Sequence, residues 1–305
     1  MTEPMQRIDS HTHLDQVLDL PDGHSFLQVL KDNNITAICH AEAYKEPETT
    51  EDLTSNNPGI PEDIISNEPE IVDNLIPKGP RTADDLMVYF FEMRERCEEA
   101  RRAGVTVYRT AGIHPQKIPS TWETINDVDL YAMRAIFEAE FSCDDVVALG
   151  EVGLEVRGNE IQRYLLGLQL EYARDNRLPV AIHTPRQNKH IVSDELFTLI
   201  EGFGQLPICI EHAGDITILG AALDKGYYAG ITVCDNKASV DTALLLIKKY
   251  QEHADRIMIN SDVVKVNLPE YQKYLDVADR VAKEISPEVA KQVCHDTAKE
   301  FYRLG

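Results

Sequence analysis

Short apolar runs rich in β-branched residues alternate with longer amphipathic stretches along most of the chain. Eight of the short runs are expected to be strands, at 6–9, 36–41, 105–112, 146–150, 179–183, 207–212, 227–233 and 256–262. Helical spacing of the apolar positions lies between them and is clearest over 160–176 and 239–254. Two last helices are expected from about residue 268 and residue 287.

This alternation of strands and helices is typical of a parallel sheet built from βα units. Eight parallel strands with intervening helices close most economically into a (β/α)8 barrel, the TIM barrel, and a doubly wound open sheet is the alternative. Because 305 residues is an ordinary length for one such barrel, we expect a single domain over 1–305.

One segment interrupts the alternation. Residues 46–80, which follow the second expected strand, are acidic, rich in proline and asparagine, and without periodicity. A loop of this length is uncommon after a barrel strand, and loops at this end of a barrel surround the active site. The insertion is therefore a candidate lid or a contact in a homo-oligomer, and a solvated insertion is the alternative.

The charge balance is strongly acidic. There are 52 Asp and Glu residues against 30 Lys and Arg residues, which gives a formal net charge of -22. Such a field repels phosphate backbones, so a broad nucleic-acid-binding surface is not expected. The sequence offers neither the apolar core of a signal peptide nor a run that could span a membrane. We therefore expect a cytoplasmic protein without a membrane partner.

The six cysteines are scattered along the chain. No two of them form a C-x-x-C pair, so neither a zinc ribbon nor a disulfide framework is expected. Cys39, Cys209 and Cys234 lie in apolar runs, and we expect them in the core.

Side chains of the kind that bind metals collect at the ends of the expected strands. They are His11 and His13 after the first strand, Glu151 after the fourth, and His183, His212 and Asp262 at the ends of the fifth, sixth and eighth. In a barrel these strand ends open onto one face, where active sites are built. His11 and His13 are two residues apart, so on an extended chain both imidazoles point the same way.

An H-x-H pair by itself is more often a solvated polar turn. Here, however, four of the six groups cap apolar runs, where an unpaired polar group costs about 1–3 kcal/mol. A shared metal explains all six positions at once. Mixed imidazole and carboxylate sites suit Zn, Mn, Fe or Mg, and a carboxylate between two clusters could bridge two ions. We expect one or two divalent ions and hydrolysis by a metal-activated water, whose pKa on zinc falls from about 15.7 towards 7.

Several motifs resemble those of the TatD-like metal-dependent hydrolases of the amidohydrolase superfamily. They are "DSHTHLD" (9–15), "GIHP" (112–115), "ALGEVGLE" (148–155), "IHTPR" (182–186), "EH" (211–212) and "SD" (261–262). Their order and spacing match together, and the resemblance covers nearly the whole chain except 46–80.

The resemblance implies a role for each site residue. Its ligand set would be His11, His13 and Asp262 at the first metal, His183 and His212 at the second, and Glu151 as the bridge. Asp262 would also orient or deprotonate the attacking water, and His114 corresponds to a family histidine near the substrate. Glu151, Asp262 and His114 would thus be the catalytic group. Arg186 falls where a guanidinium could meet an anionic oxygen of the substrate, and a surface arginine is the equal alternative.

The best-known activity of the family is metal-dependent nuclease action on DNA ends, and other members are phosphoesterases. This chain departs from the nuclease pattern, because "EHAGD" and "NSDVVKVN" stand where those members carry an aromatic residue and an E-T-D-S-P-Y-like run. It resembles more closely a TatD-related branch with unknown substrate. We expect hydrolysis of a small or short phosphoester. Amide or lactone hydrolysis is the first alternative, and a non-catalytic metal-binding barrel is the second.

Two further readings concern histidines. The polymerase-and-histidinol-phosphatase-like phosphoesterases also begin with D-x-H-x-H, but the D-x-H that normally ends their set of motifs is missing after Asp262.

His40, near the end of the second strand, could line the pocket, and a core histidine is the favoured alternative. The others are expected on helices, His24 and His190 at helix starts, His253 near a helix end and His295 on the last helix.

Overall fold

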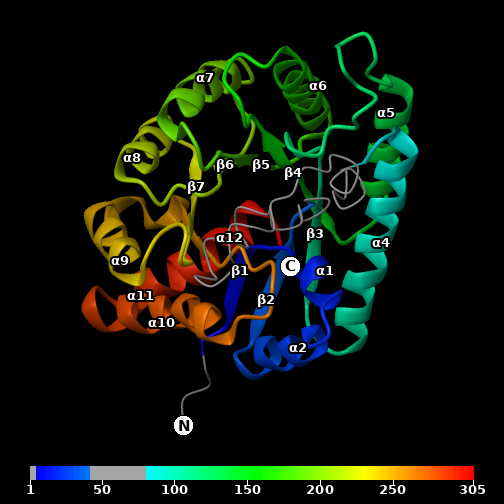
Figure 1. The fold of residues 1–305 in the computed structure, drawn as a ribbon. Coiled ribbons are helices and arrows are strands. Elements are labelled where there is room, and N and C mark those ends of the chain that lie inside the picture. The colour runs from blue at the N-terminus through cyan, green and yellow to red at the C-terminus, as the bar shows by residue number, and fades with distance from the viewer. Residues whose placement is uncertain (1–4, 42–79) are drawn as a thin grey trace, which may run out of the picture.

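The computed structural model describes residues 5–41 and 80–305 of the chain. The expected insertion at 46–80 therefore lies outside the described residues, apart from Pro80. Figure 1 shows the described strands in the middle of the molecule and the helices around them.

Eight parallel strands form one sheet, and their order in space is their order in the chain. They are β1 (Arg7–Thr12), β2 (Ile35–Cys39), β3 (Val107–Ala111), β4 (Val146–Gly153), β5 (Val180–His183), β6 (Ile208–Ile210), β7 (Tyr228–Thr232) and β8 (Ile257–Asn260). The first and last strands meet just beyond β8, where the His13 amide donates to the Val263 carbonyl and the Asp262 amide to the His11 carbonyl, both at 2.9 Å. The sheet is thus a nearly closed barrel, and the predicted (β/α)8 fold is confirmed.

Helices follow the strands and cover the outside of the barrel (Figure 1). Those in the described residues are α1 (Leu14–Leu18), α2 (Gly23–Asp32), α4 (Ala83–Arg102), α5 (Leu130–Glu140), α6 (Glu160–Asn176), α7 (Lys189–Glu201), α8 (Ile216–Asp224), α9 (Val240–Lys249), η3 (Gln251–Arg256), α10 (Leu268–Glu284), α11 (Pro287–Lys291), η4 (Gln292–Asp296) and α12 (Thr297–Phe301). The four helices that the sequence predicts most clearly, over 160–176, over 239–254 and from 268 and 287, are all present.

Many of these helices begin at a residue whose side chain accepts a backbone N–H of the first turn. The side chains of Asn159, Asp215, Ser239 and Asn267 do so for α6, α8, α9 and α10. At α4, Thr82 and Asp85 satisfy each other's backbone amides in a capping box. These caps place the helix starts, and with them the loops that follow the strands, at the carboxyl end of the barrel.

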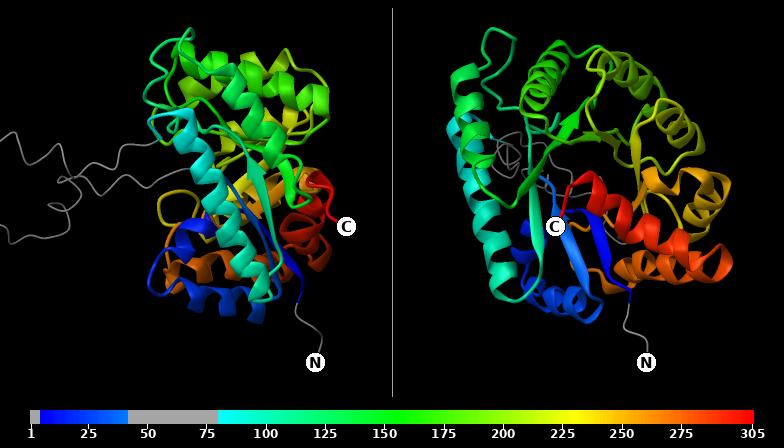
Figure 2. Two further views of the ribbon diagram at one scale, coloured as in Figure 1. Left: turned by 90° about the vertical axis from the view of Figure 1, so that its right-hand side faces the viewer. Right: turned by 180° about the vertical axis from the view of Figure 1, so that it is seen from behind.

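The inside of the barrel has its own small apolar core. It contains Ile8, Ile38, Ala148, Cys209 and Met258 from the strands and Ala298, Phe301 and Tyr302 from the C-terminal end of the chain. The right-hand view of Figure 2 shows the last helices lying across this end of the strands. The amino end of the barrel is therefore plugged, which leaves the carboxyl end for the chemistry.

The structure corrects several strand ends and the burial of one cysteine. β4 runs to Gly153, so Glu151 lies within it and not after it. β6 ends at Ile210 and β8 at Asn260, so His212 and Asp262 lie two residues beyond their strands.

The first strand runs to Thr12 rather than to Asp9, so His11 lies within β1, because residues up to Thr12 still pair with β2. Cys39 and Cys209 are buried as expected, but Cys234 is only half-buried, because β7 ends at Thr232 and Cys234 belongs to the loop that follows.

The four helix-borne histidines lie where the sequence predicts them. His24 is in the first turn of α2 and His190 in that of α7, whereas His253 lies in η3 and His295 in η4. Among the helices of residues 5–41 and 80–305, none is both long and apolar enough to cross a membrane.

A buried arginine connects β3 to the residues around the end of α5. Arg109 is fully buried, and its Nη1 lies 2.5 Å from Glu140 Oε2. Its Nε and Nη2 lie 2.7 Å and 3.1 Å from the two oxygens of Asp145. Burial would raise the pKa of Asp145, but its bonds to Arg109 and Arg101 lower the pKa below the ordinary value of 3.8.

Candidate metal centre

The structure brings all six predicted ligands together at the carboxyl end of the barrel. His11 is part of β1, Glu151 lies in β4 and His183 ends β5, whereas His13, His212 and Asp262 lie just beyond their strands. All six side chains are almost completely inaccessible to solvent. Buried imidazoles and carboxylates in this number require partners, so their mutual geometry decides what the site can do.

Glu151 lies between three of the histidines. Its Oε2 is 3.4 Å from His11 Nε2, and its Oε1 is 3.0 Å from His183 Nδ1 and 3.2 Å from His212 Nε2. The two carboxylate oxygens thus face two different groups of imidazoles. Burial would raise the pKa of Glu151, but the surrounding histidines, His11 first, hold the pKa well below its usual value.

Asp262 and His13 form the second part of the site. His13 Nε2 and His11 Nε2 lie 3.1 Å and 3.5 Å from Asp262 Oδ1. Burial would raise the pKa of Asp262 as well, but Lys237 and the neighbouring histidines hold it well below the ordinary value. Both carboxylates are therefore ionised, which is the form that binds a cation.

The backbone presents Asp262 in an unusual conformation that Asp9 holds in place. Asp262 has φ +52°, in the left-handed region that side chains other than glycine seldom adopt. Directly before it, the Ser261 amide and hydroxyl donate to the Asp9 carboxylate at 2.9 Å and 2.6 Å, and the Tyr271 hydroxyl donates to it at 3.0 Å. Asp9 thus fixes the end of β8, so that the Asp262 side chain turns into the centre.

Two further glutamates support the histidines from behind. Glu211 Oε2 lies 3.3 Å from His11 Nδ1, and Glu155 Oε2 lies 2.9 Å from His183 Nε2. Neither residue could be assigned from the sequence, although both belong to family motifs, Glu211 to "EH" and Glu155 to "ALGEVGLE". The space that Glu211 occupies depends on Gly230, where a Cβ atom would approach its Oε2 to 2.2 Å.

The other two histidines have comparable outer partners. His13 Nδ1 lies 3.2 Å from the His40 carbonyl oxygen, and His212 Nδ1 lies 2.9 Å from Thr232 Oγ1. In all four histidines, then, one ring nitrogen is engaged by a partner behind the site and the other points towards Glu151 or Asp262. Ligands of bound metals in proteins are oriented in this way.

The donor set fits a divalent metal ion. His11 is completely buried, and within the described residues its ring nitrogens contact carboxylate oxygens only at 3.3–3.5 Å, without the geometry of a hydrogen bond. Donor atoms lie within 4.8 Å of one another in the groups His11, Glu151 and His212, and His11, His13 and Asp262. A cation shared by these donors would satisfy the buried nitrogens and neutralise the two carboxylates.

His114 lies among these ligands and not in the open pocket. Its side chain is buried, its Nε2 is 3.8 Å from Glu151 Oε2, and its ring packs edge-on against His183 at 4.4 Å. With Glu151 and His183 it forms another group whose donor atoms are within 4.8 Å. The structure thus places His114 close enough to bind the same ion as His183.

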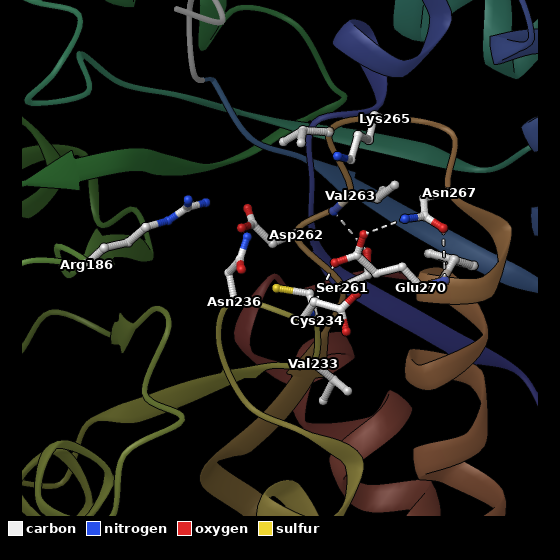
Figure 3. Close-up of a pocket in the computed structure, with 13 residues that line it drawn as sticks. Arg186, Val233, Cys234, Asn236, Ser261, Asp262, Val263, Lys265, Asn267 and Glu270 are labelled. Atoms are coloured by element: carbon white, nitrogen blue, oxygen red, sulfur yellow. Dashed lines mark hydrogen bonds between the residues drawn. The ribbon is translucent and has the colours of Figure 1, made fainter. Parts of the chain in front are cut away.

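His40 and Arg186 have different surroundings. His40 is buried behind His11, with the two rings stacked at 4.0 Å, and its Nε2 lies 3.0 Å from the Ser10 carbonyl oxygen. It is therefore a core histidine, as favoured above. Arg186 is exposed and lines a pocket that opens beside Asp262 (Figure 3).

A lysine that the sequence analysis did not single out enters the centre from the loop after β7. Lys237 Nζ lies 2.5 Å from Asp262 Oδ2 and 2.8 Å and 3.1 Å from the ring nitrogens of His212. Nothing in "CDNKAS" indicates this role, because the contact depends on how the loop crosses the barrel mouth.

Fold and site together define a class of proteins, the (β/α)8 barrels that hold divalent metal between histidines and carboxylates at the carboxyl ends of their strands. The family model described as TatD related DNase matches residues 8–303. The chain belongs to this TatD family of metal-dependent hydrolases, as the sequence motifs predict.

Individual relatives agree with this assignment. An uncharacterized metal-dependent hydrolase of Methanocaldococcus jannaschii is 29% identical over 210 residues, which are 66% of this chain and 76% of that protein. The fold matches the crystal structure of a TatD-like protein from Archaeoglobus fulgidus with a TM-score of 0.64 and 24% identity, over 97% of this chain and 100% of that chain. It also matches the phosphotriesterase homology protein from Escherichia coli, with phosphate in its active site, at a TM-score of 0.63 and 11% identity, over 98% and 99%.

Proposed function

We propose that this protein hydrolyses a phosphoester bond in a small or short substrate, with one or two divalent ions held by His11, His13, Glu151, His183, His212 and Asp262. The observation that carries the proposal is the convergence of four inner imidazole nitrogens on the two ionised carboxylates Glu151 and Asp262. Bound there, a divalent ion would lower the pKa of a water molecule and polarise the phosphoryl oxygen.

Four residues of the chain would bind the ions, accept a proton or bind the substrate. Glu151 faces both groups of imidazoles, so its carboxylate would bind the ion or ions that these histidines hold. Asp262 lies at the edge of the pocket, where its carboxylate accepts the proton of the attacking water. His114 stands beside Glu151, close to where the reacting group would lie, and Arg186 on the pocket wall would bind an anionic oxygen of the substrate.

A phosphoester is favoured over the alternatives by two considerations. The family is described as nucleases, and the related barrel from Escherichia coli carries phosphate in its active site. Amide or lactone hydrolysis stays the second candidate, since the same site would stabilise attack on a carbonyl carbon. Zn, Mn and Mg all remain candidates for the metal.

The test is a hydrolase screen of the purified protein with Mg, Mn or Zn, on phosphodiester, phosphomonoester, lactone and amide substrates. We expect metal-dependent phosphoester cleavage that a chelator abolishes. Asp262→Asn should lose most turnover while it keeps most of its metal, whereas His24→Ala, at an exposed helical histidine, should behave as the wild type. Cleavage of lactones or amides alone would overturn the phosphoester assignment, and inactivity on all four classes would favour the non-catalytic alternative.

Three attributes of the whole protein also remain proposals. We keep a single domain over 1–305, a cytoplasmic location and a homo-oligomer as testable expectations. Limited proteolysis, fractionation of cells and light scattering would test them in turn.

A further inference from the structure

A pocket of about 480 Å³ opens beside Asp262 (Figure 3). Its walls come from the loops that follow β7 and β8, from the first turn of α10 and from Arg186 in the loop after β5. This volume lies within the range of about 300–1,000 Å³ that is usual for small-molecule sites. Since Asp262 belongs to the candidate metal centre, a molecule in this pocket would lie next to the reacting bond.

Each carboxylate of the pocket already has an ion-pair or hydrogen-bond partner. Asp235 forms an ion pair with Lys273. Glu270 accepts hydrogen bonds from the Asp235 amide at 3.1 Å and from Asn267 Nδ2 at 3.0 Å. The third carboxylate, that of Asp262, is held by the lysine of the centre. Asp235 and Asp262 are thus paired with lysines, whereas Glu270 is held in place by two neutral N–H donors that leave its negative charge in the pocket.

The positive charges of the pocket have no such partners. Within residues 5–41 and 80–305, neither Arg186 nor Lys265 forms an ion pair or a side-chain hydrogen bond. In Figure 3 their charged ends approach from opposite sides, with Asp262 between them. The protein has a net charge of -22, so two cationic side chains without an ion-pair partner at one small pocket make this part of the surface more positive than the rest.

We propose that this pocket is a subsite for a second anionic group of the substrate, a carboxylate or a phosphate, bound between Arg186 and Lys265. Charge-assisted bonds from a guanidinium and an ammonium are the strong way to hold such a group. Val233 and Val264 offer apolar surface for the carbon skeleton that joins it to the reacting end. The inference rests on the proposed function for the ion at that end, and it names the substrate class as small organic esters with an anionic group at both ends.

Isothermal titration calorimetry tests the subsite by comparing two ligands that carry an anionic group at each end with a ligand that carries only one. The ligands are glutarate, 4-phosphonobutyrate and, as the compound with one anionic end, butyrate. The full chain is titrated with zinc and again without added metal. We expect glutarate or 4-phosphonobutyrate to bind zinc-loaded protein about tenfold more tightly than butyrate, with Arg186→Gln and Lys265→Gln each removing most of that preference.

Lys248→Gln is the matched control. Lys248 is exposed on α9 outside this pocket, so its replacement changes the net charge equally. The subsite is overturned if neither dianion is preferred, if both pocket variants keep the preference, or if Lys248→Gln removes as much of it. Circular dichroism confirms that these exposed substitutions leave the fold intact.

The titration does not depend on turnover, so the two proposals can fail separately. Without added metal, the sensitivity of dianion binding to Arg186 and Lys265 should remain, because both cations belong to the chain. A protein that binds dianions in this way but hydrolyses nothing would contradict the proposed function and support the subsite. A protein that hydrolyses phosphoesters without any dependence on these cations would support the proposed function and contradict the subsite.

Discussion

The outer partner of each histidine decides which nitrogen faces the centre. Glu211 is the clearest case, because its carboxylate is fully buried, lies 3.3 Å from His11 Nδ1 and also accepts a hydrogen bond from Asn260 at 3.0 Å. A carboxylate in this position holds one tautomer of the imidazole and makes the other nitrogen a better ligand. The six ligands are thus only part of what the centre needs.

Replacing Glu211 should therefore weaken metal binding without removing a ligand. We expect Glu211→Gln to lower the affinity for zinc about tenfold to a hundredfold, the range found for such partners. Competition with a chelating dye measures this affinity. Glu123→Gln, at an exposed glutamate, is the control, and equal affinities in the two variants would show that Glu211 does not position His11.

Lys237 should act in the opposite direction. Its ammonium lies 2.5 Å from Asp262 Oδ2. A metal ion that binds Asp262 must therefore replace the ammonium at this carboxylate and is also repelled by its positive charge. We expect Lys237→Met to raise zinc affinity about tenfold, since like charges at such distances repel by a few kcal/mol in a partly buried site. Lys237→Arg keeps the charge and should bind zinc as the wild type does. Weaker zinc binding by Lys237→Met would mean that the lysine supports the ligands instead of competing with the ion.

These residues also mark the limit of what the sequence could predict about the site. The six candidate ligands could be predicted because they recur at the ends of expected strands, and four of them end apolar runs, where a polar residue is conspicuous. Glu155, Glu211 and Lys237 could not be assigned, because their roles come from contacts with residues 25 or more positions away, such as Lys237 with Asp262.

At the scale of elements, the sheet is held by more than its hydrogen bonds. Arg109 in β3 is fully buried and binds Glu140 at the end of α5 and Asp145 just before β4. Arg109 and Glu140, which are buried, and the partly buried Asp145 thus tie a strand, a helix and the next strand together. Removing Arg109 leaves Asp145 with Arg101 and the buried Glu140 with only the more distant contact to Arg94, at 3.3 Å, which is costly.

We expect Arg109→Met to lower the free energy of unfolding by about 3–5 kcal/mol, the usual cost of breaking a buried ion pair. Urea unfolding followed by circular dichroism measures the change. Arg134→Met, which removes an exposed pair with Glu138, should cost much less. Similar losses in the two variants would contradict the structural role of Arg109.

The same network predicts a pH dependence. The pKa of Asp145 is lower in the folded protein than its ordinary value of 3.8, so its contribution to stability is complete above that pH and is lost as the pH falls through the lowered value. Unfolding free energies measured at acidic pH should therefore fall less steeply in Arg109→Met than in the wild type. If the unfolding free energy fell equally steeply with pH in both proteins, Arg109 would not be the cause of the lowered pKa of Asp145.

Most elements could be predicted from periodicity, whereas their exact ends could not. The strand–helix alternation gave all eight strands, because each is apolar and bounded by polar residues. The error at Cys234 has a simple cause, since an apolar residue just beyond β7 continues the pattern although pairing with β8 has already ended. Pairing across strands, which periodicity does not contain, sets where a strand stops.

At the scale of the molecule, the net charge of -22 bears on the size of the substrate. The acidic surface repels a long polyanion over its whole length, whereas the cations of the centre and its pocket attract one small anion locally. The family description as nucleases therefore does not by itself make long DNA the substrate of this chain.

We expect the metal-loaded protein to cleave a phosphodiester of dinucleotide size more efficiently than long duplex DNA at equal concentrations of bonds. Raising the salt concentration should reduce this difference, because it screens the repulsion of the duplex. Release of product from both substrates, measured at low and high salt, tests this expectation. Faster cleavage of the duplex at low salt would contradict it.

The central claim is that the six side chains at the barrel mouth hold divalent metal. Elemental analysis of protein reconstituted with zinc, and then freed of loosely bound ions, tests it most directly in the wild type, in His13→Ala and in His24→Ala. We expect one or two ions per chain in the wild type and in His24→Ala, and fewer in His13→Ala. Equal metal content in all three proteins, or none in the wild type, would contradict it.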